Sequence, residues 1–391
     1  MAGESYILMR KDTPITAILI YDNGEMARFS DKIKYPELMP LEGLQDPQTC
    51  LKEWWKSRSI PITQGNVKRI LEQMGYALSE EYLSKNLGLS LTDYYWIKPI
   101  DSPLTWKEVN LFENDFKENL VLFQEDADTP RTPGYSPNSS LQGQLEKTWT
   151  IADGKRCMIK GNHSELSSES INEVIAATIH ELQGHEHAEY SLINISGKEY
   201  DYGCISPLFT SLDDELVSAY ALYSSCKKKN DISRYEHFIN VCTEHGMEPG
   251  YVRRGLDYQI MTDFIISGFD RHLNNIAFIR DADTLKFKGF APIYDCGGAF
   301  YVNQRLPETL RELKGLKTNG FNSKESMLIK NVSDYNVIDL TKLPPASYIK
   351  EMYGKDSHAS KKLIDTVGWI YEAKIDMCRA LQLGKDPYSI K

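Results

Sequence analysis

Two short segments in the second half of the chain constrain its fold and chemistry more than any others. The first, Gly268–Phe278, places Asp270 five residues before Asn275 in a polar loop that runs into an apolar strand. The second, Ala291–Gly298, places Asp295 after a short apolar strand and before two glycines. The residues between them predict strand, tight turn and strand, so a hairpin would bring both carboxylates to the same end.

Either aspartate alone is more often a turn residue than a ligand, because Asp and Gly are common in tight turns. Two carboxylates and an amide at one end of a hairpin instead favour phosphoryl transfer. Asp270 would lie beside the attacking hydroxyl. Asn275 and Asp295 would hold Mg²⁺, which prefers hard oxygen ligands, and the triphosphate of ATP would supply further oxygens.

A candidate phosphate loop lies upstream, at Ser140–Trp149. A loop that contains Gly143 and hydroxyl side chains and runs into a strand can cradle phosphates with backbone N–H groups, although one glycine also fits a plain hairpin loop. The next predicted strand ends at Lys160, in the position of the strand lysine that neutralises ATP phosphates in kinases. If Lys160 is only a solvated strand-end charge, Lys147 is the next candidate phosphate partner.

A helix is predicted over residues 169–183, and Glu173 projects away from its apolar stripe. This carboxylate could face a cleft or plain solvent, or it could serve only the capping box that it forms with Ser170. Two strands follow, and the segment after them occupies the place of a kinase hinge. Backbone groups from Ile205 to Phe209 would then contact adenine.

Taken together, the motifs resemble those of the HipA-like (high-persistence toxin) serine/threonine kinases. The resemblance is carried by Asp-Arg-His-x-x-Asn at 270–275, by the Tyr-Asp step at 294–295 and by Ser-x-x-Gly-x-x-Glu-Lys-Thr at 140–148. The first motif is also similar, more distantly, to that of the phosphoinositide lipid kinases. Two departures stand out: many HipA-like kinases have Asp-Gly-His at the first motif, and protein kinases have Phe-Gly where this chain has Cys296-Gly297.

The resemblance implies an ATP- and Mg²⁺-dependent kinase that transfers phosphate to a Ser or Thr hydroxyl of a protein substrate. It also implies that the protein could be the toxin of a toxin–antitoxin system, with an antitoxin protein as partner. In the family, a helix glutamate at the place of Glu173 pairs with the strand lysine, which implies a Lys160–Glu173 pair here. In the family, the serine at the place of Ser140 is an autophosphorylation site that switches the kinase off. The adjacent Ser139 is an alternative site for the same modification.

We therefore expect an α+β protein with a bilobal protein-kinase-like fold. Its expected parts are a small mixed N-terminal region (1–120) that packs on the N-lobe, a β-rich N-lobe (121–208) and a mostly helical C-lobe (209–391). The C-lobe is predicted to begin with three helices, over 215–227, 232–244 and 251–268. Residues 126–140 are rich in Pro and hydroxyl side chains and are expected to form a mobile linker.

Charge and cysteine usage limit the remaining classes. The chain has 391 residues and a formal net charge of −10, so direct nucleic-acid binding is not expected. Its seven cysteines are scattered without CxxC pairs, which is typical of a reducing compartment. The first residues lack an apolar signal-peptide core and no run has the length of a membrane span, so we expect a cytoplasmic protein that makes no membrane contact.

Two alternatives to a protein kinase stay open at this point. A lipid or small-molecule kinase would use the same residues, although the chain shows no obvious basic patch for a membrane surface. A pseudokinase would bind nucleotide as a switch without transferring phosphate. The presence of Asp270, Asn275 and Asp295 argues against the pseudokinase.

Overall fold

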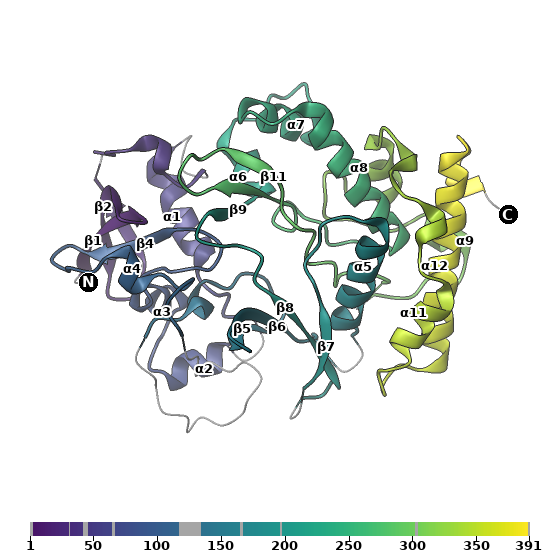
Figure 1. The fold of residues 1–391 in the computed structure, drawn as a ribbon, viewed down its shortest axis with the longest axis horizontal. Helices are drawn as coiled ribbons and strands as arrows, with labels where there is room; N and C mark the ends of the chain where they lie inside the picture. Colours follow the sequence, from purple (N-terminus) through teal and green to yellow (C-terminus); the bar gives the residue numbers. More distant parts are fainter. Residues whose placement is uncertain are drawn as a thin grey trace.

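The computed structural model describes residues 3–30, 32–41, 46–64, 67–116, 134–164, 167–195, 198–301 and 304–389. Over these residues the chain is a mixed α+β protein with three antiparallel sheets, as expected for its fold class. The sheets occupy the N-terminal and central parts, whereas helices dominate toward the C-terminus (Figure 1). No helix in the described part combines the length and the apolar character needed to cross a membrane.

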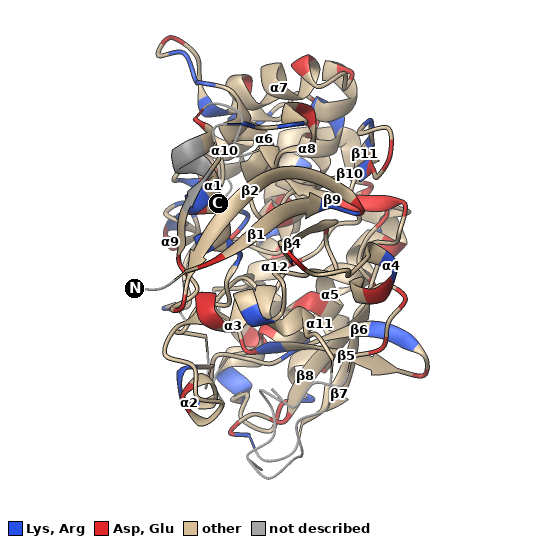
Figure 2. Cartoon of the chain, turned by 90° about the vertical axis from the view of Figure 1, so that its left-hand side faces the viewer, with Lys and Arg blue, Asp and Glu red and all other residues tan. Residues whose placement is uncertain are grey.

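The N-terminal region builds a sheet with the strand order β3-β2-β1-β4, covered by short helices. Trp55 supports the hairpin turn at 22–24 by donating its Nε1–H to the carbonyl of Gly24 (2.8 Å). Acidic and basic residues are interspersed along this side of the chain (Figure 2). The strands are β1 (Gly3–Arg10), β2 (Thr13–Tyr21), β3 (Met26–Phe29) and β4 (Tyr95–Pro99). The helices are η1 (Pro36–Leu38), α1 (Pro47–Arg58), α2 (Val67–Gln73), α3 (Ser79–Lys85) and α4 (Trp106–Val109).

The central sheet has the order β5-β6-β8-β7, and helix α5 packs against it. Asp153 and Gly154 both have positive φ (50° and 73°), the backbone geometry that a type I′ hairpin turn requires. The elements are η3 (Pro137–Ser140), β5 (Lys147–Ala152), β6 (Lys155–Lys160), α5 (Glu169–Gln183), β7 (Ser191–Asn194) and β8 (Tyr202–Pro207).

The third sheet has the order β11-β10-β9 and leads into the helical part. The hairpin predicted between Asn275 and Ile293 is present as the antiparallel pair β10–β11. The strands are β9 (Asp214–Ser218), β10 (Ala277–Asp281) and β11 (Phe287–Phe290). The α-helices are α6 (Ala219–Ser225), α7 (Arg234–Glu244), α8 (Pro249–Ile265), α9 (Leu310–Leu313), α10 (Glu325–Leu328), α11 (Ala346–Tyr353) and α12 (Lys361–Gln382). Short 3-10 helices are η4 (Ile329–Asn331), η5 (Tyr335–Val337), η6 (Leu340–Lys342) and η7 (Pro387–Ser389).

The helix predicted over 215–227 is wrong in its first part, because residues 214–218 form strand β9 and α6 begins at Ala219. Glu215 shows the physical reason. Its buried carboxylate accepts hydrogen bonds from Arg10 (3.1 Å) and Arg280 (2.8 Å), and a buried charge is tolerated only when it is paired. These partners are distant in sequence, so local periodicity does not report them.

The prediction of a mobile linker over 126–140 is wrong for its described part. Residues 137–140 form η3, and Asn138 is fully buried. The Asn138 side chain donates to Thr148 (3.0 Å) and accepts from the backbone N–H of Trp149 (2.7 Å), which fixes η3 to β5. Residues 126–133 lie outside the described residues.

The N-terminal region also lies against the segment that follows β8. The Tyr94 hydroxyl donates to the carbonyl of Ser211 (2.8 Å), and Thr210 donates to the carbonyl of Leu91 (2.6 Å). The same region shares one hydrophobic core with residues of β5 and β6, including Trp149. Together with the bond from Arg10 to Glu215 of β9, these contacts join it to both the central sheet and the third sheet.

Candidate active site

The candidate site centres on the amine of Lys160 at the end of β6. Its Nζ lies 2.7 Å from Oε1 of Glu173 and 2.7 Å from Oδ1 of Asp295. The Tyr190 hydroxyl lies 3.2 Å from the same amine. Three residues that the sequence singled out separately therefore meet at one ion-paired cluster.

Glu173 connects this cluster to the backbone that follows Asp295. Its Oε2 accepts the backbone N–H of Cys296 (2.8 Å), while Oε1 pairs with Lys160. Asp295 has a φ of 58°, a left-handed conformation that costs free energy for a residue other than glycine. Such strain persists only where the surroundings hold it, and the Glu173 contact supplies part of that restraint.

The electrostatics of the cluster keep Lys160 and Asp295 charged. Burial opposes the ionisation of Asp295, but the attraction of Lys160 and Lys147 outweighs it and holds the pKa of Asp295 well below its usual range. Burial also opposes the charge of Lys160, but Asp295 and Glu173 raise the pKa of Lys160 above its ordinary value. Asp295 is thus an anionic carboxylate beside a cationic amine.

Lys147 adds a second amine to the same face of the sheet. It is directly opposite Lys160 in the β5–β6 register, and directly paired residues point to the same face. A Cβ at Gly143 would come within 2.7 Å of the Lys147 Nζ, so the loop glycine leaves room for that amine. Gly143 also has a φ of 93°, which favours glycine.

The catalytic-loop candidates lie beside the segment that follows Asp295. The Phe269 N–H donates to the carbonyl of Gly298 (3.0 Å), which places half-buried Asp270 next to the glycine pair. The Asn275 side chain donates through Nδ2 to the carbonyl of Asp270 (3.0 Å). The hairpin thus brings the two segments together at one end, as the sequence predicted.

Arg271 is a residue of this loop that the sequence showed as a departure from many HipA-like kinases but to which no role was assigned. Its buried guanidinium pairs with Asp263 (3.0 Å). It also donates to the carbonyl of Tyr294 (2.7 Å) and to the Cys296 Sγ (2.9 Å). Arg271 therefore joins the loop that carries Asp270 to both neighbours of Asp295, and its place between Asp270 and His272 was the available signal.

Asn172, also missed, lies next to Glu173 on α5 and is fully buried. It donates to the carbonyls of Gly297 (2.9 Å) and Ala299 (3.1 Å) and accepts from the Tyr353 hydroxyl (2.6 Å). A polar residue that must be buried on a helix was the only sequence signal. Through these hydrogen bonds, Asn172 connects α5, α11 and the segment after Asp295.

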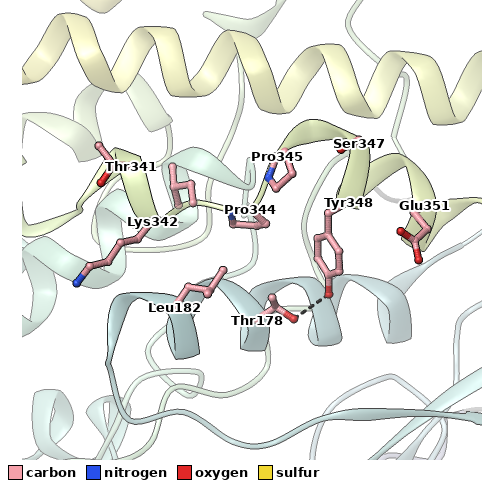
Figure 3. Close-up of a pocket in the computed structure, with 10 residues that line it drawn as sticks. Thr178, Leu182, Thr341, Lys342, Pro344, Pro345, Ser347, Tyr348 and Glu351 are labelled. Carbon is pink, nitrogen blue, oxygen red and sulfur yellow. Dashed lines mark hydrogen bonds between the residues drawn. The ribbon is translucent and has the colours of Figure 1, made fainter.

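Helix α11 holds α5 at a second point, on the edge of a cavity of 620 Å³. Tyr348 and Thr178 share a hydrogen bond of 2.8 Å there (Figure 3). The cavity is lined by residues of α5 and of 341–351. It is thus separate from the Lys160 cluster.

Comparison with solved structures identifies the fold. Over 97% of this chain and 98% of the other, the protein is similar to a chain of the HipA–HipB–operator DNA complex of the Shewanella oneidensis MR-1 toxin–antitoxin system, with a TM-score of 0.54 and 12% identity. The chain has the HipA-like kinase fold. The proinflammatory kinase CtkA of Helicobacter pylori is also similar, over 61% of this chain and 95% of CtkA, with 18% identity and a TM-score of 0.46. No family model and no curated protein matches the sequence.

Within this HipA-like fold, the donor set suits Mg²⁺. Asp295 is anionic and is half-buried, and its Oδ1 is engaged by Lys160. The Asn275 amide donates through nitrogen, so its oxygen is the atom left to act as a ligand. A carboxylate and an amide oxygen are hard ligands of the kind that Mg²⁺ prefers.

The remaining predicted site residues are Ile205, Phe209 and Ser140, and the structure shows their contacts with residues outside the Lys160 cluster. Ile205 pairs with Ile159 in the β6–β8 register, and the Phe209 ring lies 5.8 Å from the ring of Tyr294. Ser140 donates to the carbonyls of Leu89 (2.9 Å) and Pro137 (3.0 Å). Those bonds hold Ser140 within η3, and among the described contacts none joins its side chain to Lys160 or Asp295.

Proposed function

We propose that the protein is an ATP- and Mg²⁺-dependent kinase that transfers the γ-phosphate to a Ser or Thr hydroxyl of a protein substrate. The observation that carries this proposal is the double ion pair of Lys160 with Glu173 and Asp295, at 2.7 Å each. Phosphoryl transfer requires a cation for the phosphates beside an anion for the metal, and this cluster places them side by side. The HipA-like fold supports the same reading.

The chain's residues would divide the work as follows. Asp270 orients the acceptor hydroxyl, because a loose transition state depends on positioning more than on early proton removal. Asn275 and Asp295 would hold Mg²⁺, which when bound neutralises phosphate charge. The amines of Lys160 and Lys147 and the backbone N–H groups near Gly143 would bind the phosphates. Backbone groups from Ile205 to Phe209 would contact adenine, between an N-lobe (121–208) and a C-lobe (209–391).

The test is transfer of label from ATP in the presence of Mg²⁺, with two variants and a control. Asp270→Ala should abolish transfer and keep nucleotide binding, whereas Asp295→Ala should weaken both. Asp283→Ala is the matched control, because this exposed aspartate lies on the same hairpin and pairs only with Lys11 among the described residues (2.7 Å). Full transfer by Asp270→Ala would refute the assignment.

The same assay separates the alternatives. Nucleotide binding without transfer to the protein itself or to protein acceptors would favour a pseudokinase, and label found only in lipid or small molecules would favour those kinases. We also propose autophosphorylation at Ser140 as inhibitory control. HipA occurs in a complex with HipB and operator DNA, so an antitoxin protein is a candidate partner for this chain as well. Co-purification with the product of a neighbouring gene tests that partner.

A further inference from the structure

Resting on the proposed kinase function, we infer that Asn319 is a positioning residue that fixes the carboxylate of Asp270 for the acceptor hydroxyl. The Asn319 Nδ2 donates to Oδ1 of Asp270 at 2.8 Å. Among the described residues, no other donor bonds the Asp270 carboxylate. The second oxygen, Oδ2, is therefore left for the incoming hydroxyl.

The backbone of Asn319 holds the catalytic loop as well. Its N–H donates to the carbonyl of Phe269 (2.8 Å), the residue directly before Asp270. At the next position, a Cβ on Gly320 would come within 3.2 Å of the Arg271 carbonyl, so a glycine permits the close approach. The turn thus touches the loop on both sides of Asp270.

The other end of this turn is fixed to the helical part. The Thr318 N–H donates to the Ser323 carbonyl (3.2 Å), and the Thr318 hydroxyl donates to the Asn322 carbonyl (2.6 Å). Phe321 is buried, and its ring lies 5.4 Å from that of Phe238 on α7. The alternative is that this turn is a pseudosubstrate, a segment that blocks the site and must leave before an acceptor can enter. A turn anchored in this way instead stays in place.

The chemistry explains why such a contact matters for transfer and little for ATP binding. Asp270 is half-buried and Asn319 is exposed, so both are open to an acceptor. A carboxylate at such a site can rotate, and a donor on one oxygen restricts that rotation. Because phosphoryl transfer depends on alignment of the hydroxyl with the phosphate, the loss of this restraint lowers the rate of the chemical step.

The experiment compares matched substitutions in the same turn. Asn319→Ala removes the donor, Asn319→Asp keeps the size but places a second carboxylate at Asp270, and Asn319→Ser restores a shorter donor. Asn322→Ala and Asn322→Asp are the controls, because Asn322 bonds Asn331 (2.8 Å) and not Asp270. For each variant we would measure Mg²⁺-ATP hydrolysis, transfer to dephosphorylated casein, ATP affinity and melting temperature.

We expect Asn319→Ala to lower the rate at saturating ATP by about tenfold and Asn319→Asp by about a hundredfold, as for other misaligned reacting groups. Asn319→Ser should recover part of the rate. ATP affinity should stay within about twofold of wild type for all three, because the phosphates bind elsewhere. Both Asn322 variants should behave like wild type.

Two results would overturn the inference while the wild type is active. One is an Asn319→Ala protein that is as fast as wild type or faster, the latter indicating an inhibitory gate. The other is an Asn319→Ala protein whose rate, ATP affinity and melting temperature all fall, with the same losses in Asn322→Ala. That result would indicate a structural role. A wild type without any Mg²⁺-ATP-dependent activity would instead overturn the proposed function and this inference with it.

Discussion

Lys147 and Lys160 stand directly opposite each other across the β5–β6 pair, with both amines on the face that carries Asp295. Two like charges opposite each other in a sheet repel, so such a pair is unfavourable unless anions lie nearby. Asp295 and Glu173 neutralise Lys160. Lys147 is left as the amine with charge to spare for a ligand.

The charge of Lys147 predicts a pH dependence of ATP affinity. Burial lowers the pKa of Lys147 to about 8, with Lys160 adding to the shift and Asp295 opposing it. The amine is charged below this pKa and neutral above it, so affinity for the anionic phosphates should fall as the pH rises from 7.5 to 9. A loss of up to about tenfold is expected for one unit above the pKa.

Calorimetric titration of ATP at both pH values checks this prediction. The comparison is Lys147→Met, which should bind ATP more weakly than wild type but with little change over this pH range. If the two proteins lose affinity in parallel, another group is responsible.

The contact between Tyr353 and Asn172 predicts an effect on residues 295–299, the segment that begins with the proposed metal ligand Asp295. Tyr353→Phe leaves the Asn172 oxygen buried without its donor, at a cost of about 1–3 kcal/mol, and loosens the residue that bonds the carbonyls of Gly297 and Ala299. The Mg²⁺ concentration needed for half-maximal activity should therefore rise.

Tyr348→Phe is the matched control, since it also removes a hydroxyl between α11 and α5. Its partner Thr178 makes no described contact with residues 295–299. Both variants should melt at lower temperature, but only Tyr353→Phe should change the Mg²⁺ dependence. Equal Mg²⁺ dependence in the two variants would contradict the role of Asn172.

Phosphorylation of Ser140 should be incompatible with η3 as it stands. Its hydroxyl donates to two carbonyls, and a phosphate would place about −1.5 to −2 charges against those acceptors. We expect η3 to leave its site and ATP affinity to fall. Mass spectrometry after incubation with Mg²⁺-ATP should locate the phosphate, with Ser140→Ala as the variant that lacks it.

Ser139 provides the comparison, because it is fully buried whereas Ser140 is half-buried. Ser139→Ala should still be phosphorylated at Ser140. Inhibition through Ser140 would be contradicted by active transfer to other sites without any phosphate at Ser140. It would also be contradicted by phosphorylated protein with unchanged ATP affinity.

Glu215 should be a large contributor to stability, because it lies buried between Arg10 and Arg280. Glu215→Gln removes the shared anion and leaves two guanidinium groups without it, which costs about 3–5 kcal/mol for a buried pair. Asp283→Ala breaks the exposed pair with Lys11 and should cost less than about 1 kcal/mol. Urea unfolding of both variants measures the difference, and similar values would contradict this ranking.

Local pattern was sufficient for much of the fold. The strands β1 to β3, the hairpin of β10 and β11 and helix α5 follow from alternation, turn residues and helical spacing, which act within a few residues. Lys160, Glu173 and Asp295 were each given a candidate role, and the pairing of Lys160 with Glu173 was one of the alternatives that the sequence left open. The order of the motifs along the chain suggested these roles, because each of the three residues lies in or just after a predicted strand or helix.

Long-range contacts set the limit of that reasoning. Strand β9 was predicted as helix because its partners, Arg10 and β10, lie far away in sequence. Asn319 lies in a polar stretch without periodicity, so nothing local indicated its bond to Asp270. Asn138, which fixes η3, looked like one more linker residue because its partners belong to the next strand.

The packing of the N-terminal region against residues 210–211 has a consequence for the rate of nucleotide exchange. This region bonds the connecting segment, shares a core with β5 and β6 and reaches β9 through Arg10. The segment that contains residues 210–211 is therefore held by contacts on its outer side and should resist bending. We expect the central sheet and the helical part to rotate little relative to each other about this segment. We therefore expect ADP to leave without a rotation of whole domains, a motion that takes microseconds to milliseconds.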